Sequence, residues 1–164
     1  MRIALISDTH LPKRAKKLPE FLMNGLRGAE LIIHAGDWTT YEVYDALQSI
    51  APVVGVRGNV DLPELPFEEK ITIVVKGYRI GVVHGHVGKK KTTPDRAYEA
   101  FQGQELDMIV FGHSHIPYKQ YHGETLLFNP GSPTDKRFQP QFSFGIVTLG
   151  ETLDAEHFYF DQKD

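Results

Sequence analysis

The residues best suited to chemistry are carboxylate, amide and imidazole side chains that follow short apolar runs of the chain. Asp8 and His10 come directly after the apolar run at residues 2–6. In an extended chain, side chains two positions apart leave the backbone on the same side, so one metal ion could bind both. Two such residues alone would indicate little, but the same arrangement recurs further along. The later positions are Asp37, Asn59, His84, His113 and His115.

These seven side chains offer imidazole, carboxylate and amide donors and no sulfur. Such a set favours mid-row divalent metals over calcium, with Mn the first expectation and Ni, Fe, Co or Zn as alternatives. Seven groups exceed the needs of one tetrahedral ion. We therefore expect two divalent ions per chain, roughly 3.5–4 Å apart. Asp37 is central in the order of the strands and is expected to bridge the ions.

The charge balance of such a centre favours a small phosphodiester substrate. After Asp8 and Asp37 offset part of the charge of two divalent ions, the remainder suits a bridging hydroxide together with a phosphodiester monoanion. Water bound to a metal loses a proton near neutral pH and can supply the nucleophile. The same ions then stabilise charge on the phosphorus oxygens.

In the first half of the chain, strands alternate with helices. Apolar runs at residues 2–6 and 30–33 predict buried strands, the first buried on both faces, and residues 52–56 predict a third strand. Helical spacing of apolar residues predicts two intervening amphipathic helices, the first over two to three turns from residue 18 and the second capped by Thr39 or Thr40. This βαβ pattern brings Asp8 and Asp37 to the edge of the sheet where ligands bind in open α/β folds.

In the second half, strands predominate. Residues 71–75 and 78–83 predict a hairpin, residues 93–103 a helix, and residues 107–111 a further strand. The last part predicts antiparallel strands at residues 118–121, 125–128, 142–149 and 152–160.

Length and composition exclude several classes of protein. A chain of 164 residues predicts one domain, residues 1–164. The net charge of −3 gives no sign of a nucleic-acid surface. There is no cysteine, which removes disulfides and thiolate metal sites. No signal peptide or membrane-length apolar run is evident, so we expect no membrane partner and a cytoplasmic location.

Five motifs then resemble, in order over residues 1–135, those of the calcineurin-like metallophosphoesterases. They are D-x-H at residues 8–10, G-D at 36–37, G-N-x-D at 58–61, H-G-H at 84–86 and G-H-x-H at 112–115. The likeness is greatest to the small bacterial and archaeal phosphodiesterase branch, which has no added domains and often shows the N-P-G turn, here at residues 129–131.

The resemblance implies an α/β fold, a four-layer αββα sandwich of two mixed β-sheets flanked by helices, with a dinuclear site at the carboxyl ends of the strands. By the family pattern, one ion would be held by Asp8, His10, Asp37 and His115. The other would be held by Asp37, Asn59, His84 and His113. We expect catalytic roles for Asp37, Asn59 and His86, with substrate contacts for Asn59 and His86, although ligand and structural roles stay open for His86.

One position departs from the family pattern. The third place of G-N-x-D often holds a histidine that can protonate the leaving group, and here it is Val60. Asp61 is expected to be a turn or helix-cap acceptor instead. Structural or core positions are expected for His34, Trp38, His122 and His157. The basic loops at residues 12–17 and 89–91 are expected to be solvated, although the first could attract an anionic substrate.

The leading hypothesis is therefore a metal-dependent phosphodiesterase. The alternative is a largely non-catalytic metal-binding scaffold resembling the small retromer subunit. Val60 favours this alternative, whereas the complete ligand set favours the enzyme. A metallo-β-lactamase-type hydrolase is disfavoured because its H-x-H-x-D-H signature is missing. The sequence leaves open whether the chain forms a homo-oligomer.

Overall fold

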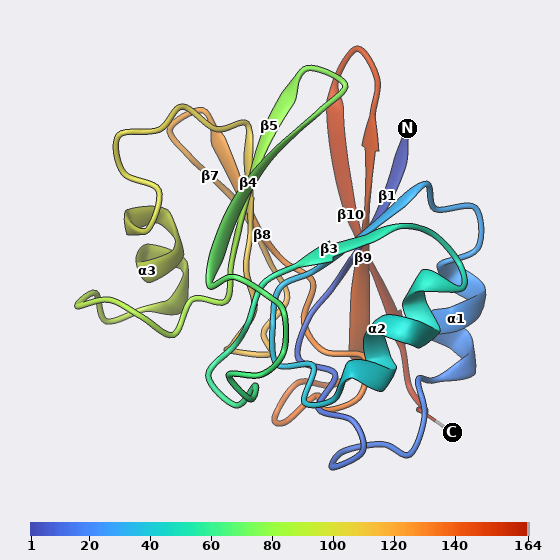
Figure 1. Ribbon diagram of the computed structural model, residues 1–164. Helices are drawn as coiled ribbons and strands as arrows, with labels where there is room; N and C mark the ends of the chain where they lie inside the picture. The colour runs from blue at the N-terminus through green and yellow to red at the C-terminus, as the bar shows by residue number, and fades with distance from the viewer. Residues whose placement is uncertain (164) are drawn as a thin grey trace.

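A computed structural model describes residues 1–163 and contains two five-stranded sheets (Figure 1). The first sheet comprises β1 (Arg2–Ile6), β2 (Leu31–His34), β3 (Val53–Gly55), β9 (Phe142–Leu149) and β10 (Leu153–Phe160), in the order β10-β9-β1-β2-β3. The second comprises β4 (Lys70–Val75), β5 (Tyr78–Val83), β6 (Met108–Val110), β7 (Tyr118–His122) and β8 (Thr125–Asn129), in the order β4-β5-β6-β8-β7. The helices are α1 (Glu20–Gly25), α2 (Tyr41–Gln48) and α3 (Thr93–Glu99).

The alternation of side chains along β1 shows why this strand lies between two layers of core. Ala4 and Ile6 pack in a cluster with residues of α1 and α2, whereas Ile3 and Leu5 pack in a second cluster with residues of the other sheet. Successive side chains of a strand point to opposite faces, so an apolar run with no polar position must be covered on both sides. The strand is buried on both faces, as the sequence predicts.

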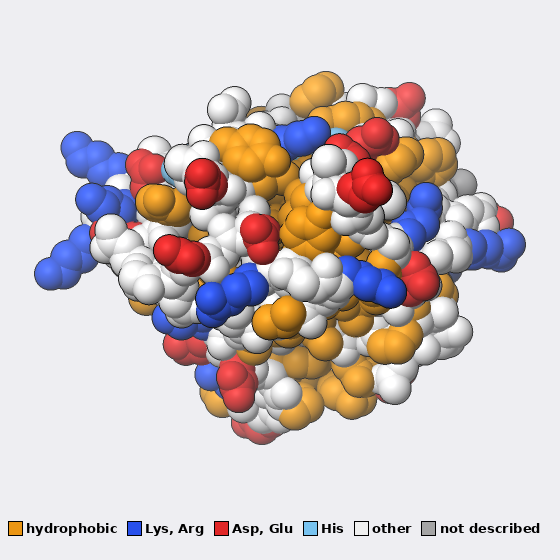
Figure 2. All heavy atoms as spheres, turned by 90° about the horizontal axis from the view of Figure 1, so that it is seen from above, with side chains coloured by type: hydrophobic (Ala, Val, Ile, Leu, Met, Phe, Trp, Pro, Cys, Tyr) orange, Lys and Arg blue, Asp and Glu red, His pale blue; other side chains and the backbone are white. Residues whose placement is uncertain are grey.

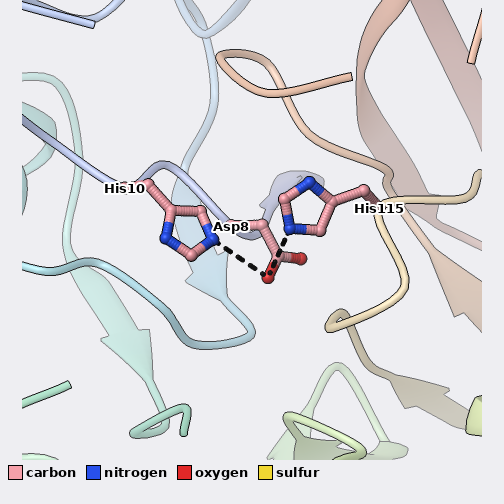
Figure 3. Close-up of side chains that lie close together, drawn as sticks. All are labelled: Asp8, His10 and His115. Carbon is pink, nitrogen blue, oxygen red and sulfur yellow. Dashed lines mark ion pairs between the residues drawn. The ribbon is translucent and has the colours of Figure 1, made fainter. Parts of the chain in front are cut away.

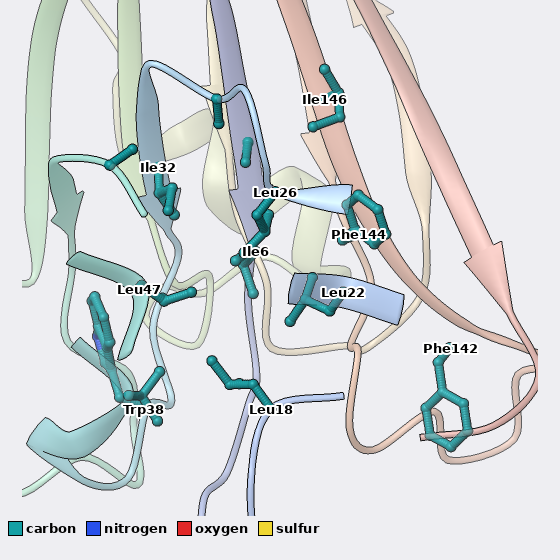
Figure 4. Packing of buried hydrophobic residues seen from close by; sticks show 14 of the residues in the cluster. Ile6, Leu18, Leu22, Leu26, Ile32, Trp38, Leu47, Phe142, Phe144 and Ile146 are labelled. Carbon is teal, nitrogen blue, oxygen red and sulfur yellow. The ribbon is translucent and has the colours of Figure 1, made fainter. Parts of the chain in front are cut away.

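Three hydrophobic clusters define four layers. The first cluster lies between α1, α2 and the first sheet, and Figure 4 shows its packing with Leu22, Leu47, Ile32 and Phe144 among the labelled residues. The second lies between the two sheets, and the third lies between α3 and the outer face of the second sheet. The predicted αββα sandwich of two mixed sheets is confirmed.

The parallel strands place their carboxyl ends at one side of the molecule. In the first sheet β1, β2 and β3 are parallel, with Ile6 opposite His34 and His34 opposite Gly55. In the second sheet β5, β6 and β8 are parallel. The segments that follow β1, β2, β3, β5 and β6 emerge on the lower side of the molecule in Figure 1. All five motifs lie on these segments.

The helices differ from the prediction in the length of α1 and in the capping of α2. Helix α1 spans six residues and is shorter than the expected two to three turns. Thr40 is at the N-cap position of α2, but its side chain makes no capping hydrogen bond. In α3 the cap is Thr92, whose side chain accepts a hydrogen bond from the backbone N–H of Asp95.

The face opposite the motif loops carries the β4–β5 and β9–β10 turns. Figure 2 shows acidic and basic side chains intermixed around apolar groups on this face. Among the described residues, none of the helices is both long and apolar enough to cross a membrane.

Candidate metal centre

The first cluster of donor atoms comes from the loops after β1 and β6. Asp8, His10 and His115 each offer one ligand atom, and these atoms lie within 4.8 Å of one another. The Nε2 atoms of His10 and His115 lie 3.8 and 3.5 Å from Oδ1 of Asp8. Figure 3 shows both imidazoles directed toward this carboxylate oxygen. All three residues are buried, so the cluster forms the floor of the candidate site.

The second cluster comes from the loops after β2, β5 and β6. Asp37, His84 and His113 offer ligand atoms within 4.8 Å of one another. Asn59 joins them, because its Oδ1 lies 3.2 Å from Nδ1 of His113. Asn59 is exposed and His113 half-buried, so this cluster is open to solvent on one side.

Asp37 lies between the two clusters. Its Oδ2 is 3.0 Å from Nε2 of His84 and 3.6 Å from Nε2 of His10. Oδ1 of Asp8 is likewise 3.7 Å from Nε2 of His84. Donor atoms of both clusters therefore surround one space, with a carboxylate between them.

Several of these atoms are buried without a hydrogen bond in the described part of the chain. They are Oδ1 of Asp8 and the Nε2 atoms of His10, His84 and His115. Buried polar atoms are nearly always paired, because an unpaired group loses its hydration energy. Imidazole nitrogen and carboxylate oxygen are ligands of mid-row divalent metals. The donor set therefore fits two such ions.

The other nitrogen of two imidazoles is held by the backbone. Nδ1 of His84 lies 2.7 Å from the carbonyl oxygen of Ala35, and Nδ1 of His115 lies 2.5 Å from that of Asp135. A carbonyl only accepts, so each Nδ1 donates, and in the neutral ring each Nε2 turns its lone pair toward the site. Such partners fix the tautomer and orientation of metal-binding histidines.

The ligand loops adopt a backbone conformation that side chains rarely take. The φ angles of Asp8, His10, Asp37, His113 and His115 are 58°, 45°, 60°, 70° and 62°. Left-handed conformations of non-glycine residues are uncommon, although Asp and His adopt them more readily than most, and strained ones cluster at functional sites. This corrects one step of the sequence reasoning: Asp8 and His10 do share a cluster, but through two left-handed residues and not through an extended chain.

Two motif glycines allow the loops to approach each other. A Cβ at Gly58 would lie 2.1 Å from Oδ1 of Asp37, and a Cβ at Gly112 would lie 1.9 Å from Oγ of Ser7. Any side chain at either position would displace an adjoining carboxylate or its support. The glycines of G-N-x-D and G-H-x-H are therefore needed for space.

Asp61 holds two of the ligand loops together. Its Oδ2 accepts hydrogen bonds from the backbone N–H groups of Asp37 and Gly58, at 2.9 and 2.8 Å, and its Oδ1 accepts one from Thr39. Burial, followed by the charge of Asp37, raises the pKa of Asp61 above its usual value, against these hydrogen bonds. The expected role as a turn acceptor is confirmed, and the residue also fixes the loop that carries Asp37.

The N-P-G turn supports the Asp8 loop, a role that the sequence analysis missed. Oγ of Ser132 donates to the carbonyl oxygen of Asp8 at 2.7 Å, and Oγ1 of Thr134 donates to that of Thr9 at 2.6 Å. Nδ2 of Asn129 donates to the carbonyl oxygen of Gly112. The run of polar residues after the turn was the available signal, because a rigid, buried polar turn must find partners nearby.

The electrostatics of the clusters favour ionised carboxylates. Burial alone would raise the pKa of Asp8, but His84, His10 and His115 hold it well below its usual value. Burial would lower the pKa of His84, but Asp8 and Asp37 raise it to about 9. Without a metal, His84 therefore shares a proton with the carboxylates. Metal binding must displace that proton, because ligands bind in their deprotonated form.

The other histidines behave differently. Burial and then the neighbouring His84 lower the pKa of His113 to about 4. His34 hydrogen-bonds with Thr9 and Gly36 and stacks on Trp38, so its expected structural role is confirmed. His122 and His157 likewise make hydrogen bonds within the fold. Trp38 is fully buried in the core, as expected.

His86 and Val60 border the site without joining either cluster. The ring of His86 lies 5.3 Å from that of His84 and 6.1 Å from that of His113. Burial, followed by the charge of His84, lowers the pKa of His86. Val60 is 47% exposed, and its backbone N–H donates to Oδ1 of Asp37 at 3.0 Å. The backbone of Val60 thus supports the site, while its side chain faces outward.

Residues 1–152 match the family model of the calcineurin-like phosphoesterase superfamily domain. The chain belongs to the calcineurin-like phosphoesterase superfamily. A probable metallophosphoesterase of Methanothermobacter thermautotrophicus is 38% identical over 161 residues, which are 95% of this chain and 91% of the relative. One of Methanocaldococcus jannaschii is 41% identical over 158 residues, which are 95% of this chain and 80% of the relative. These matches support a hydrolase with divalent metals in a dinuclear site.

Two solved structures share the fold. Vps29 of Entamoeba histolytica, solved in complex with zinc, has a TM-score of 0.80 at 22% identity and covers 98% of this chain and all of its own. An archaeal phosphodiesterase has a TM-score of 0.75 at 21% identity and covers 98% of this chain and all of its own. At these identities the likeness shows the calcineurin-like fold.

Proposed function

We propose that this chain is a metal-dependent phosphodiesterase with two divalent ions per chain. The observation that carries the proposal is the pair of donor clusters that share the space around Asp37, with unpaired Nε2 and Oδ1 atoms directed into it. Mn is the proposed native metal, with Ni, Fe, Co or Zn as alternatives. When bound, the ions would supply a water nucleophile at neutral pH and stabilise charge on the phosphate.

The proposed roles follow from the positions of the side chains. Asp8, His10 and His115 would hold one ion, and Asn59, His84 and His113 the other, with Asp37 shared. Asn59 is exposed and could also bind a phosphate oxygen. His86 is proposed as a substrate contact, since it borders the second cluster without belonging to it.

Diester specificity is favoured by charge and by Val60. The carboxylates of Asp8 and Asp37 offset part of the charge of two ions. The positive charge that remains suits a diester monoanion better than a monoester dianion. Val60 offers no proton to the leaving group, so esters with weakly basic leaving groups should react fastest.

The second candidate is a largely non-catalytic metal-binding scaffold. The likeness of the fold to the Vps29 structures favours it. The difference between the two candidates is turnover, because both would bind metal.

The deciding experiment combines metal analysis with hydrolysis. The purified chain, loaded with Mn and desalted, should contain two ions and hydrolyse bis(p-nitrophenyl) phosphate faster than p-nitrophenyl phosphate. Asp37→Asn should lose at least one ion and the activity, whereas the control Asp45→Asn, on the exposed face of α2, should keep both. Two bound ions without turnover of either ester would support the scaffold. Full activity of Asp37→Asn would contradict the shared carboxylate.

A further inference from the structure

We propose that a hollow beside the second donor cluster binds the uncharged organic substituent of the phosphodiester, a planar ring or a group of similar size. The proposal rests on the proposed phosphodiesterase function and names the substrate class of that site. The hollow lies between β4, the end of β5, helix α3 and the loop at residues 85–88. Its volume is about 290 Å³.

The hollow adjoins the candidate metal centre through His86. This residue lines the hollow, and its ring lies 5.3 Å from the ring of His84 in the second cluster. Its Nδ1 is buried and has no hydrogen-bond partner among residues 1–163. A phosphate held at the cluster would therefore have one ester substituent within reach of His86 and of the hollow beyond it.

The walls of the hollow are largely apolar. Val83, Val87 and Ala100 contribute apolar surface, together with the aliphatic part of Arg96. Val87 is 62% exposed and stands at the mouth. Binding sites for small organic groups combine such walls with a few polar groups that orient the ligand. A volume of about 290 Å³ suits a single ring with its substituents.

The basic side chains of the hollow are already engaged by the protein. Nε of Arg96 donates to the carbonyl oxygen of Gly85, its NH1 donates to those of residues 90 and 91, and its NH2 donates to Oγ1 of Thr93. Nζ of Lys70 donates to the carbonyl oxygen of Ala100 and lies over the ring of Phe101. Arg96 thus directs four hydrogen bonds into the protein, and Lys70 directs one.

Two carboxylates also line the hollow. Glu69 lies 3.7 Å from Arg57 and Glu99 lies 3.7 Å from Lys90, so each already has a cationic partner. The charged groups of the hollow are therefore paired with neighbouring groups of the protein, and its apolar walls remain for a ligand. The structure thus assigns the hollow to a neutral substituent.

The test uses three diesters that share a p-nitrophenyl leaving group and differ in the retained ester group, which is methyl, phenyl or 4-carboxyphenyl. The phenyl ester should exceed the methyl ester in kcat/KM by about tenfold, the scale of a modest apolar contact. The carboxyphenyl ester should show no such gain. Equal kcat/KM values for the phenyl and carboxyphenyl esters would overturn the assignment to a neutral group.

A matched pair of substitutions then locates the effect. Ala100→Phe fills the hollow, and the phenyl-to-methyl ratio of kcat/KM should fall to about one. Gln102→Phe, two residues further on, fills a different hollow of about 210 Å³ away from the motif loops and should leave the ratio unchanged. Val87→Asp, on an exposed loop, should lower the ratio even if Ala100→Phe does not fold. An unchanged ratio in the folded variants would overturn the proposal while leaving the phosphodiesterase function intact.

A binding measurement separates the proposal from the proposed function. In ¹H–¹⁵N spectra of the full chain, diphenyl phosphate should shift the amide signals of Gly85, Gly88 and Ala100 in the parent protein but not in Ala100→Phe. If no ester is hydrolysed and these shifts still occur, the phosphodiesterase function fails and the hollow stands as a binding site. If these signals do not move, the hollow is not the binding site, whatever the rates of hydrolysis.

Discussion

At the scale of single residues, two imidazoles of the candidate centre have Nε2 toward the site and Nδ1 held by the backbone. His84 and His115 donate from Nδ1 to backbone carbonyl groups on different loops. His84 belongs to the cluster around Asp37, and His115 belongs to the cluster around Asp8. The two histidines should therefore control different ions.

We expect His84→Ala and His115→Ala each to weaken a different ion, because each removes a donor from a different cluster. Anomalous diffraction at the metal edge should show two peaks for the parent and loss of a different peak in each variant. His122→Ala, on β7, is the control and should retain both peaks. Loss of the same peak in both variants would contradict the division into two clusters.

The position of Val60 allows a test of how the leaving group takes its proton. Its side chain faces outward beside Asp37, so a histidine at this position can be accommodated without disturbing the core. We expect Val60→His to raise the rate for alkyl leaving groups most, since positioned acid catalysis is worth about 10²–10⁴-fold. The measurement is the dependence of rate on leaving-group pKa, which should flatten in the variant.

Leu62→His is the matched control, because it adds an imidazole at an exposed position two residues further along. It should keep the steep dependence of the parent. Equal slopes for the parent and Val60→His would mean that the proton comes from another group, with His86 the first to test.

At the scale of elements, the loops after the strands depend on one another. Asp61 accepts hydrogen bonds from the loop after β2 and from the loop after β3, so it joins the segments that carry Asp37 and Asn59. Ser132 and Thr134 support the loop after β1 in the same way. The strands bring the loops to one side, and these bonds determine their final positions.

We expect Asp61→Asn to weaken the second ion by about 10–100-fold, the usual effect of removing a group that orients ligands. Asparagine has only one acceptor oxygen, so at least one backbone N–H loses its partner, at a cost of about 1–3 kcal/mol. Metal titration and chemical unfolding would measure both effects. Asp107→Ala is the control, since it removes the oxygen that accepts from the backbone of Arg79, far from the site. That variant should lose stability alone; equal metal loss in both would show that Asp61 acts only through global stability.

At the scale of the whole molecule, His34 makes folding depend on pH. The backbone N–H of Gly36 donates to its Nδ1, and Nε2 is paired with Thr9, so the buried ring must be neutral. Burial, against the attraction of Asp8, lowers the pKa of His34 to about 3, from a usual value of 6.5. Between these values the unfolded chain binds the proton and the folded chain does not.

Unfolding of the metal-free protein should therefore become easier as the pH falls from about 6.5 toward 3, by up to roughly 1.4 kcal/mol per pH unit from this residue. Above pH 6.5 the contribution of His34 to the free energy of unfolding is fully present. His34→Gln should show a shallower dependence of the free energy of unfolding on pH, as measured by urea denaturation. Val43→Ala, a destabilised core variant, should keep the slope of the parent. The same slope in His34→Gln would mean that other groups titrate.

The sequence by itself determined the strands and the donor residues that follow them. Apolar runs without polar positions must be buried on both faces, and parallel strands gather their carboxyl ends at one edge, so the convergence of Asp8 and Asp37 followed from local pattern. The motifs were also enough to indicate the family. These inferences succeed because they depend on residues near in sequence and on rules common to all sheets.

The family pattern already implied how the donors are divided, and only the tertiary structure decided what separates and supports them. His113 and His115 are two positions apart, yet they lie in different clusters, because left-handed backbone at both turns their side chains apart. The three hydrogen bonds of Asp61 and the hollow beside His86 join segments distant in the chain. Such features depend on loop conformations that are stable only when several strands have already met, so no local pattern of residues encodes them.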